Sequence, residues 1–227
     1  MPHPKLLLHS YFRSSCSARV RTAAHLKGIP LEYSYVHLLN SQQSSPSYTS
    51  LNPSASVPTL SFTTFSGETV IIRQSIAILE FLEEYFPETP RLLPPPDNII
   101  GRARVRELVN IIANDTQPPT NLRILRKVKS LGGETAPAEW AKEFMGKGLE
   151  AYDKVAEGYA GRYSVGDEVT LADVCLAPAV EGALRYGVDV ERLGTVWRVY
   201  NEIRGLEAFK KGDWRHQDDT PEELRDE

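Results

Sequence analysis

The spacing of hydrophobic residues changes character once along the chain, at a proline-rich stretch over residues 87–96. Before this stretch, short apolar runs typical of strands alternate with segments of helical periodicity. Proline cannot continue a helix, so the stretch itself is typical of a linker. The pattern predicts a β-α-β start followed, after a polar loop at 40–50, by two strands and a helix. The predicted strands lie at 5–9, 31–37, 59–62 and 69–72, and the predicted helices at 15–27 and 75–86.

After the linker, apolar residues recur almost entirely at helical spacing, as at Val105, Leu108, Val109 and Ile112. We therefore predict two domains, an α/β domain over residues 1–87 and an all-α domain over residues 97–227, joined by a linker at 88–96. The acidic end of the chain, residues 218–227, has the composition of a frayed terminus.

One helix start in the second domain is marked clearly by its residues. Thr170 and Asp173 have the spacing of a capping box, and Val169 and Val174 are placed for a hydrophobic staple. We assign this motif to folding. Cys175 follows on the apolar side, where a lone cysteine is typical of a small core residue.

Composition narrows the class of protein. With 227 residues, of which 41 % are hydrophobic and 25 % charged, the chain is long enough to bury a sizeable core. Its two cysteines lie far apart, without metal-ligand spacing or a disulfide framework, which indicates a reducing compartment and no metal. No apolar run is long enough for a membrane span or a signal peptide. A net charge of -4 argues against nucleic acid as a partner. We expect a cytoplasmic protein without membrane association.

The candidate chemistry lies at the end of the first predicted strand, where Ser14, Ser15 and Cys16 stand at the start of a helix. Unpaired amides at a helix N-terminus stabilise negative charge, and a serine hydroxyl can donate a hydrogen bond to it. A bound thiolate would be a suitable guest. Lowering a thiol pKa by about 2 units takes roughly 2.7 kcal/mol. The helix terminus contributes about 0.3–1 kcal/mol and a hydrogen bond to a charged group about 1.5–3 kcal/mol. The structural alternative is an ordinary serine N-cap.

The segment Tyr11-Phe12-Arg13-Ser14-Ser15-Cys16-Ser17-Ala18-Arg19-Val20-Arg21 resembles the signature of the zeta-class glutathione transferases, the family that includes maleylacetoacetate isomerase. The resemblance extends from about Lys5 to Pro221, and its other specific parts are Gln74-Ser75 and residues 169–176. It implies the glutathione transferase architecture, in which a thioredoxin-like N-terminal domain precedes a helical domain. It also implies a cis peptide bond between Val57 and Pro58.

The resemblance assigns roles residue by residue, with glutathione as the cofactor. Thiol activation falls to Ser14, Ser15 and Cys16. Glutathione contacts fall to Ser14, Ser15, Cys16, Ser17, Arg19, Gln43, Val57, Gln74, Ser75, Gln117, Asn121 and Arg123. Contacts to an acidic substrate fall to Arg13, Arg19 and Arg185. The sequence departs from the family pattern at Ala18, Ser56 and Thr120.

Arg185 also has a reading that is independent of the family. It follows Val174 by eleven residues, about three helical turns, so we expect it on nearly the same face and directed inward. It is either satisfied by carbonyls at a helix C-terminus or a clamp for a substrate carboxylate, which guanidinium binds bidentately. These residues alone do not separate the two. The resemblance favours the clamp.

The resemblance implies a glutathione-dependent cis-trans isomerase that converts maleylacetoacetate to fumarylacetoacetate in tyrosine and phenylalanine catabolism, and a homodimer. One alternative is a broader zeta-class transferase or an α-halo-acid dehalogenase. Another is thiol-disulfide exchange with Cys16 as nucleophile. A third alternative is a non-catalytic interaction module of transferase-like fold.

Overall fold

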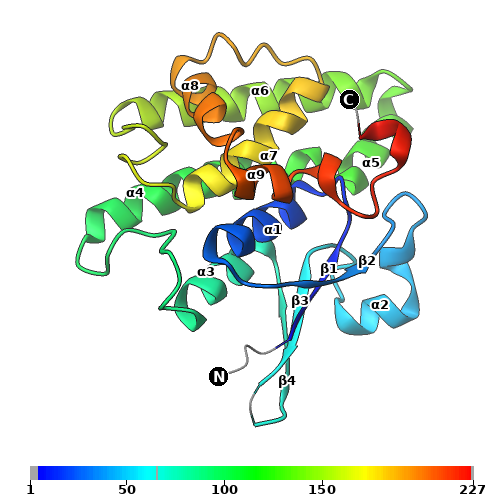
Figure 1. Ribbon diagram of the computed structural model, residues 1–227. Helices are drawn as coiled ribbons and strands as arrows, with labels where there is room; N and C mark the ends of the chain where they lie inside the picture. The colour runs from blue at the N-terminus through cyan, green and yellow to red at the C-terminus, as the bar shows by residue number, and fades with distance from the viewer. Residues whose placement is uncertain (1–4, 65, 226–227) are drawn as a thin grey trace. The chain divides into compact units, whose positions relative to one another are not determined.

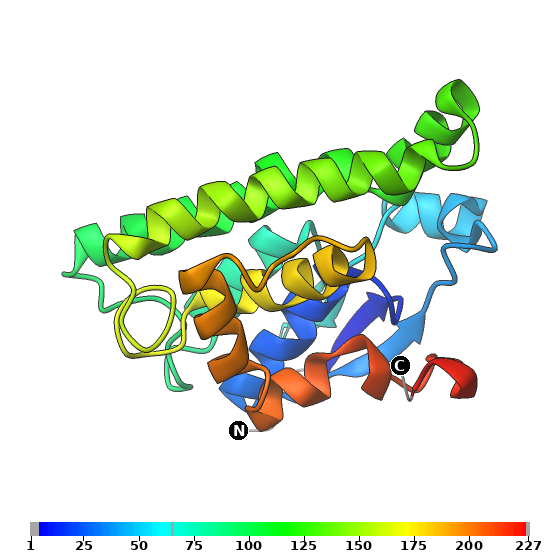
Figure 2. The ribbon, with the colours of Figure 1, turned by 90° about the horizontal axis from the view of Figure 1, so that it is seen from above.

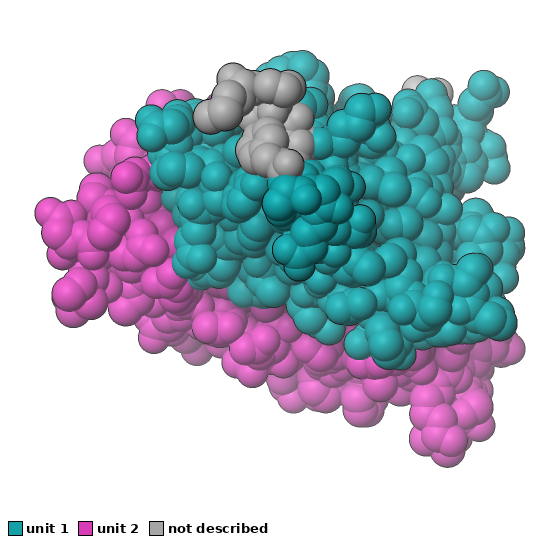
Figure 3. All heavy atoms as spheres, turned by 90° about the horizontal axis from the view of Figure 1, so that it is seen from below, with its two compact units in different colours: residues 1–90, 207–227 teal, residues 91–206 magenta. Residues whose placement is uncertain are grey.

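The computed structural model describes residues 5–64 and 66–225. It divides into two compact units (Figure 3). Unit 1 comprises Met1–Pro90 and Glu207–Glu227, and unit 2 comprises Arg91–Leu206. The chain thus leaves unit 1 at Pro90 and returns to it at Glu207. This differs from the predicted boundaries, which placed residues 207–227 in the helical domain.

Unit 1 contains a four-stranded mixed sheet with the strand order β2-β1-β3-β4 (Figure 1). The strands are β1 (Leu6–Ser10), β2 (Glu32–Tyr35), β3 (Thr59–Thr63) and β4 (Thr69–Arg73). β1 pairs with β2 in parallel and with β3 in antiparallel register, and β3 pairs with β4 in antiparallel register. All four strands were predicted, with ends that differ by at most two residues.

Local signals specify where the first helix of unit 1 begins and ends. α1 (Ser15–Lys27) ends at Gly28, whose φ of 66° is the left-handed conformation that glycine adopts without steric strain. α3 (Ser75–Tyr85) follows β4 directly. The predicted polar loop instead contains a 3-10 turn, η1 (Gln42–Ser44), and a short helix, α2 (Pro46–Leu51). α2 forms because Ser45 caps it and Pro46 occupies a position in its first turn. Backbone N–H groups of the first turn make no hydrogen bond within the helix, so the missing N–H of proline costs nothing there.

The end of the chain returns to unit 1 as α9 (Glu207–Gly212) and two 3-10 turns, η4 (Trp214–His216) and η5 (Glu222–Leu224). α9 packs against α1, and Gly212 lies so close to Thr22 that a Cβ there would be 2.0 Å from the Thr22 Oγ1. The expected frayed end is therefore wrong for its first residues, because Asp219 accepts a hydrogen bond from the Phe12 amide. Residues 226 and 227 lie outside the described residues.

Unit 2 is helical throughout its regular elements. They are α4 (Ile99–Asn110), the π-helical segment η2 (Ile111–Thr116), the 3-10 turn η3 (Pro118–Thr120), α5 (Leu122–Gly132), α6 (Ala136–Glu157), α7 (Leu171–Arg185) and α8 (Gly194–Ile203). Figure 2 shows α6 as a long helix, and it packs against η2, α5, α7 and α8. Within the part of the chain that the structure describes, no helix combines the length and apolar character that crossing a membrane requires.

The predicted capping box at the start of α7 is confirmed. The Thr170 side chain caps the helix, and Asp173 Oδ2 accepts from the Thr170 amide at 2.8 Å. Asp173 is fully buried, and its Oδ1 also accepts from the Ser164 amide. Cys175 lies in the core, as its position predicts. The motif therefore fixes the start of α7 and the loop before it.

Candidate active site

The turn between β1 and α1 presents the predicted serines and cysteine. Tyr11 and Phe12 are buried, whereas Ser14, Ser15 and Cys16 are half-buried. Ser14 is the N-cap of α1, and its Oγ accepts a hydrogen bond from the Ser17 amide at 3.1 Å. The capping interpretation is thus correct for Ser14.

Ser15 occupies a different position from its neighbour. It is the first residue of α1, and its hydroxyl has no hydrogen-bond partner among the described residues. The first turn of α1 contains no acidic residue, so nothing in that turn neutralises the positive end of the helix dipole. Ser17 is buried, and its Oγ also lacks a partner within the described part of the chain. The turn therefore has a free hydroxyl and an unopposed helix terminus beside a half-buried thiol.

A second helix start in unit 1 has a strained entry. Gln74, the N-cap residue of α3, has φ 73° and ψ 123° and makes no side-chain cap hydrogen bond. A non-glycine residue in such a conformation costs about 1–3 kcal/mol. The first turn of α3 contains no acidic residue. The uncapped amides of this turn have the geometry that binds a carboxylate.

Arg19 in α1 connects this helix to the start of α3. It is 1 % exposed, and its Nη1 donates to Ser75 Oγ at 3.2 Å. Its Nε and Nη2 have no hydrogen-bond partner among the described residues. The sequence predicted direct contacts from Arg19 to glutathione and substrate. These contacts stay predictions, and the hydrogen bond from the Arg19 guanidinium to Ser75 supports the start of α3.

Two further predicted glutathione contacts lie in the loops of unit 1. The Val57–Pro58 peptide bond is cis, as the resemblance implied, and Val57 is buried. Gln43 lies in η1, and its Oε1 is buried without a partner in the described residues. An amide oxygen in this state is available to a ligand.

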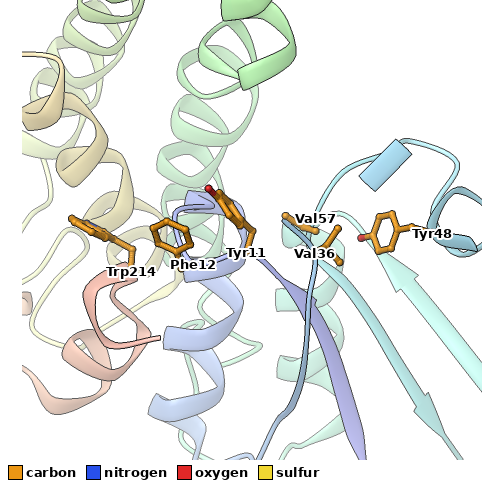
Figure 4. Packing of buried hydrophobic residues seen from close by; sticks show 6 residues of the cluster. All are labelled: Tyr11, Phe12, Val36, Tyr48, Val57 and Trp214. Carbon is orange, nitrogen blue, oxygen red and sulfur yellow. The ribbon is translucent and has the colours of Figure 1, made fainter. Parts of the chain in front are cut away.

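A hydrophobic cluster supports the turn before α1. Its buried members are Tyr11, Phe12, Val36, Tyr48, Val57 and Trp214 (Figure 4). Arg13 extends the cluster, because its guanidinium lies 5.5 Å from the Phe12 ring centre and 5.4 Å from that of Trp214. Sequence reasoning missed Trp214, since the contact joins residues about 200 positions apart and has no local signal.

The remaining predicted residues belong to unit 2. The Gln117 amide, at the junction of η2 and η3, donates to Asn121 Oδ1, and Asn121 is the N-cap residue of α5. Arg123 is exposed in the first turn of α5. The Thr120 hydroxyl donates to the Gln117 carbonyl, so this departure from the family pattern is satisfied locally.

Arg185 lies in the last turn of α7 and is exposed, so its predicted inward direction is wrong. The argument relied on Val174 marking one buried face. However, every residue from Leu171 to Leu176 is buried, and that part of α7 has no single inner face.

The other departures from the family pattern are also defined by their surroundings. Ala18 is 6 % exposed, so the smaller side chain affects packing inside unit 1 more than it affects the surface. The Ser56 carbonyl accepts hydrogen bonds from the Tyr48 hydroxyl and the Asn52 amide, both at 2.8 Å. These bonds fix the loop that leads to the cis peptide.

Comparison with known proteins gives consistent matches. The family model described as "Glutathione S-transferase, N-terminal domain" matches residues 13–85. The maleylacetoacetate isomerase of Aspergillus fumigatus is 50 % identical over 223 residues, covering 98 % of this chain and 96 % of the relative.

Two crystal structures of maleylacetoacetate isomerase from Anaeromyxobacter dehalogenans are similar over nearly the whole chain. One has glutathione bound in its active site (TM-score 0.88, 39 % identity, 97 % of this chain and 100 % of that chain). The other has dicarboxyethyl glutathione and citrate in the active site (TM-score 0.88, 39 % identity, 98 % and 96 %).

Proposed function

Because the chain belongs to the zeta-class glutathione transferases, the family of the maleylacetoacetate isomerases, we propose that it isomerises maleylacetoacetate to fumarylacetoacetate with glutathione as cofactor. The expected architecture of a thioredoxin-like domain with a helical remainder is confirmed. The observation that carries the proposal is the free Ser15 hydroxyl at an unopposed helix terminus.

The residues of unit 1 fit glutathione. The uncapped first turn of α3 suits the carboxylate of its γ-glutamyl end, and Gln74 and Ser75 would hold that end. The backbone of Val57 would pair with the cysteinyl backbone, and the unpartnered Gln43 Oε1 would accept a further hydrogen bond. Gln117, Asn121 and Arg123 stay predicted contacts from unit 2.

Bound glutathione supplies a thiolate that adds to the conjugated cis double bond and leaves after rotation about the resulting single bond. The work of the chain is to keep that sulfur anionic. Ser15 donates a hydrogen bond to it, worth about 1.5–3 kcal/mol, and the amides of the first turn of α1 add about 0.3–1 kcal/mol. Together these reach the roughly 2.7 kcal/mol that a pKa decrease of about 2 units requires. Ser14 holds the turn, and Cys16 helps to shape it.

Arginine side chains bind the substrate's carboxylates in this proposal. The guanidinium of Arg13 stacks on two rings, and its Nε has no partner among the described residues. Stacking on rings leaves a planar donor edge for a carboxylate. Arg185, exposed at the end of α7, is assigned to the second carboxylate by the resemblance. Arg19 stays a predicted contact, and its Nη1 donates to Ser75 Oγ at the start of α3. The ligands of the Anaeromyxobacter enzyme, dicarboxyethyl glutathione and citrate, support an acidic substrate.

The decisive experiment is isomerisation of a maleyl compound by the purified protein with and without glutathione. We expect turnover only when glutathione is present, with S-methyl glutathione as the control that binds but has no thiol. Equal turnover in both conditions would exclude the mechanism. A panel of α-halo-acids and general electrophiles run beside it separates a selective isomerase from a broad transferase.

We also propose that the protein is a homodimer. Ile99 and Ile100, at the start of α4, are 73 % and 64 % exposed, and apolar surface of this kind is typical of subunit interfaces. Sedimentation equilibrium of the parent and of Ile100→Asp is the test. A parent that sediments as a monomer would exclude the homodimer.

A further inference from the structure

Phe12, two residues before Ser14, is held at both of its backbone groups by charged side chains. Its amide donates to Asp219 Oδ2 at 2.9 Å, and its carbonyl accepts from Arg21 Nη2 at 3.1 Å. The carboxylate of Asp219 thus accepts from the Phe12 N–H, and the guanidinium of Arg21 donates to the Phe12 carbonyl. Hydrogen bonds to ionised groups are about twice as strong as neutral ones. A turn residue held in this way has little freedom to move.

Arg21 joins this turn to the returning end of the chain. It is fully buried, and its Nε donates to the Gly212 carbonyl at 3.0 Å while its Nη1 donates to Ser10 Oγ at 3.0 Å. These acceptors are uncharged, and Asp219 and Asp213 act on the guanidinium through space. The guanidinium therefore ties β1, the turn before α1 and α9 together.

Asp219 is not explained by stability alone. Its Oδ1 is buried and has no hydrogen-bond partner among the described residues. Burial raises the pKa of its carboxyl, although the Phe12 amide and Arg21 favour the charged form. Asp219 is half-buried, and leaving its Oδ1 unpaired offsets part of the stability that its hydrogen bond to Phe12 contributes, whereas the position that this bond gives to the turn is kept.

The aromatic contacts of the same segment act on the same turn. Trp214 packs against Phe12 with ring centres 6.5 Å apart, and Arg13 lies against both rings. Figure 4 shows Trp214, Phe12 and Tyr11 in one row beside the start of α1. The C-terminal segment therefore contacts the turn through both a carboxylate and a ring.

We propose that Asp219 is a positioning residue for thiol activation. By holding Phe12 against Arg21, it fixes the turn that presents Ser14, Ser15 and Cys16. The inference rests on the proposed function, since the thiol that this turn activates is that of glutathione. Asp219 itself touches neither glutathione nor substrate in this scheme.

The first test needs no glutathione. The chain has only two cysteines, and Cys175 is fully buried, so alkylation of the native protein by iodoacetamide reports on Cys16. We expect Asp219→Ala to alkylate at least about threefold faster than the parent, because the half-buried thiol becomes more accessible when the turn loosens. Asp218→Asn is the matched control, since the exposed Asp218 carboxylate bonds the Tyr35 hydroxyl and not Phe12. Parent-like alkylation of Asp219→Ala would overturn the proposal.

The second test follows the ultraviolet thiolate signal of bound glutathione. In Asp219→Ala we expect the thiol pKa to rise by about one unit, from about 6.5 to about 7.5, which lowers the thiolate fraction at about pH 7 roughly threefold. The kcat/KM should then fall about threefold at neutral pH, more at lower pH, and recover at alkaline pH, where the thiol ionises unaided. A purely structural loss would be the same at every pH and would overturn the proposal.

Asp219→Asn keeps the test decisive if the alanine variant does not fold. Its amide oxygen still accepts from Phe12 but carries no charge, so we expect an intermediate rise of the thiol pKa. A thiol pKa equal to that of the parent would overturn the proposal. The proposed function and the positioning role of Asp219 can be refuted separately. A parent that binds no glutathione refutes the proposed function, while the alkylation rates still decide whether Asp219 holds the turn.

Discussion

Two adjacent serines at the start of α1 have different surroundings, and this separates their roles. Ser14 Oγ is engaged by the Ser17 amide, whereas the Ser15 hydroxyl has no partner among the described residues. We predict that Ser15→Ala raises the pKa of the bound glutathione thiol by about one to two units, which corresponds to losing a hydrogen bond of about 1.5–3 kcal/mol. Titration of the ultraviolet thiolate signal measures it.

Ser14→Ala is the matched variant. It removes the N-cap, so we expect it to lower the free energy of unfolding by about 1 kcal/mol and to change the thiol pKa less than Ser15→Ala does. Urea denaturation provides the first value and the same titration the second. A larger thiol pKa change in Ser14→Ala would transfer the activating role to Ser14.

Arg185 is the residue on which substrate selection depends in the proposed function. Arg185→Ala should raise KM for a diacid substrate about tenfold or more, because a bidentate bond to a carboxylate is lost, and it should leave kcat nearly unchanged. Arg185→Lys keeps the charge without the planar fork, so its KM should lie between the KM of the parent and that of Arg185→Ala. Steady-state kinetics with a diacid and its monoester separates the carboxylate effect from general damage. Equal KM values for parent and Arg185→Ala would remove the clamp.

Among the elements, those with local signals were predictable from sequence. α1 was predicted at its observed bounds because a serine cap precedes it and Gly28 follows it. The capping box at Thr170 is another example. α2 was missed although Ser45-Pro46 is typical of a helix start, because the surrounding polar residues have no helical periodicity. The π-helical η2 has no comparable signal in the sequence.

The candidate site divides in the same way. Its serines and cysteine stand at a helix start that the sequence reveals. The residues that hold this helix start in place have no such signal in the sequence. Arg21 and Asp219 meet at Phe12 across about 200 positions, and only the folded chain brings them together. The inward direction predicted for Arg185 was wrong because burial around the first half of α7 is not confined to one face.

The Asp173 carboxyl at the start of α7 should make the stability of the fold depend on pH. Burial raises the pKa of the Asp173 carboxyl more than the hydrogen bonds from Thr170 and Ser164 lower it. The folded chain therefore keeps this proton at pH values where the unfolded chain, with a pKa near ~3.9, has lost it. In that window the folded state binds more protons, so raising the pH lowers the free energy of unfolding.

Asp173→Asn removes this titration while an amide oxygen can still accept from Thr170. The stability of the parent relative to the variant should therefore decrease as the pH rises from about 4 towards about 7. Urea denaturation of both proteins across this range provides the comparison. A relative stability that increases with pH would mean that the capping hydrogen bonds outweigh burial.

At the scale of the whole molecule, the chain returns to unit 1, where α9 packs closely against α1. α9 reaches α1 only because Gly212 has no side chain. We predict that Gly212→Ala lowers the free energy of unfolding by about 1–3 kcal/mol, as overpacking does. Gly205→Ala is the control, since a Cβ there meets no atom within 4 Å, and it should stay within about 0.5 kcal/mol of the parent. Equal unfolding curves for the two variants would contradict the close packing of α9.

The same return has a consequence for the order of synthesis. A ribosome makes residues 1–90 first, yet the acceptor for Arg21 at Gly212 and the Trp214 ring are made more than a hundred residues later. The Arg21 guanidinium of the nascent chain therefore lacks the Gly212 carbonyl as an acceptor while the intervening helices are translated. Released chains that end at Leu206 should accordingly leave the first ninety residues sensitive to protease, and released chains that continue through residue 225 should protect them.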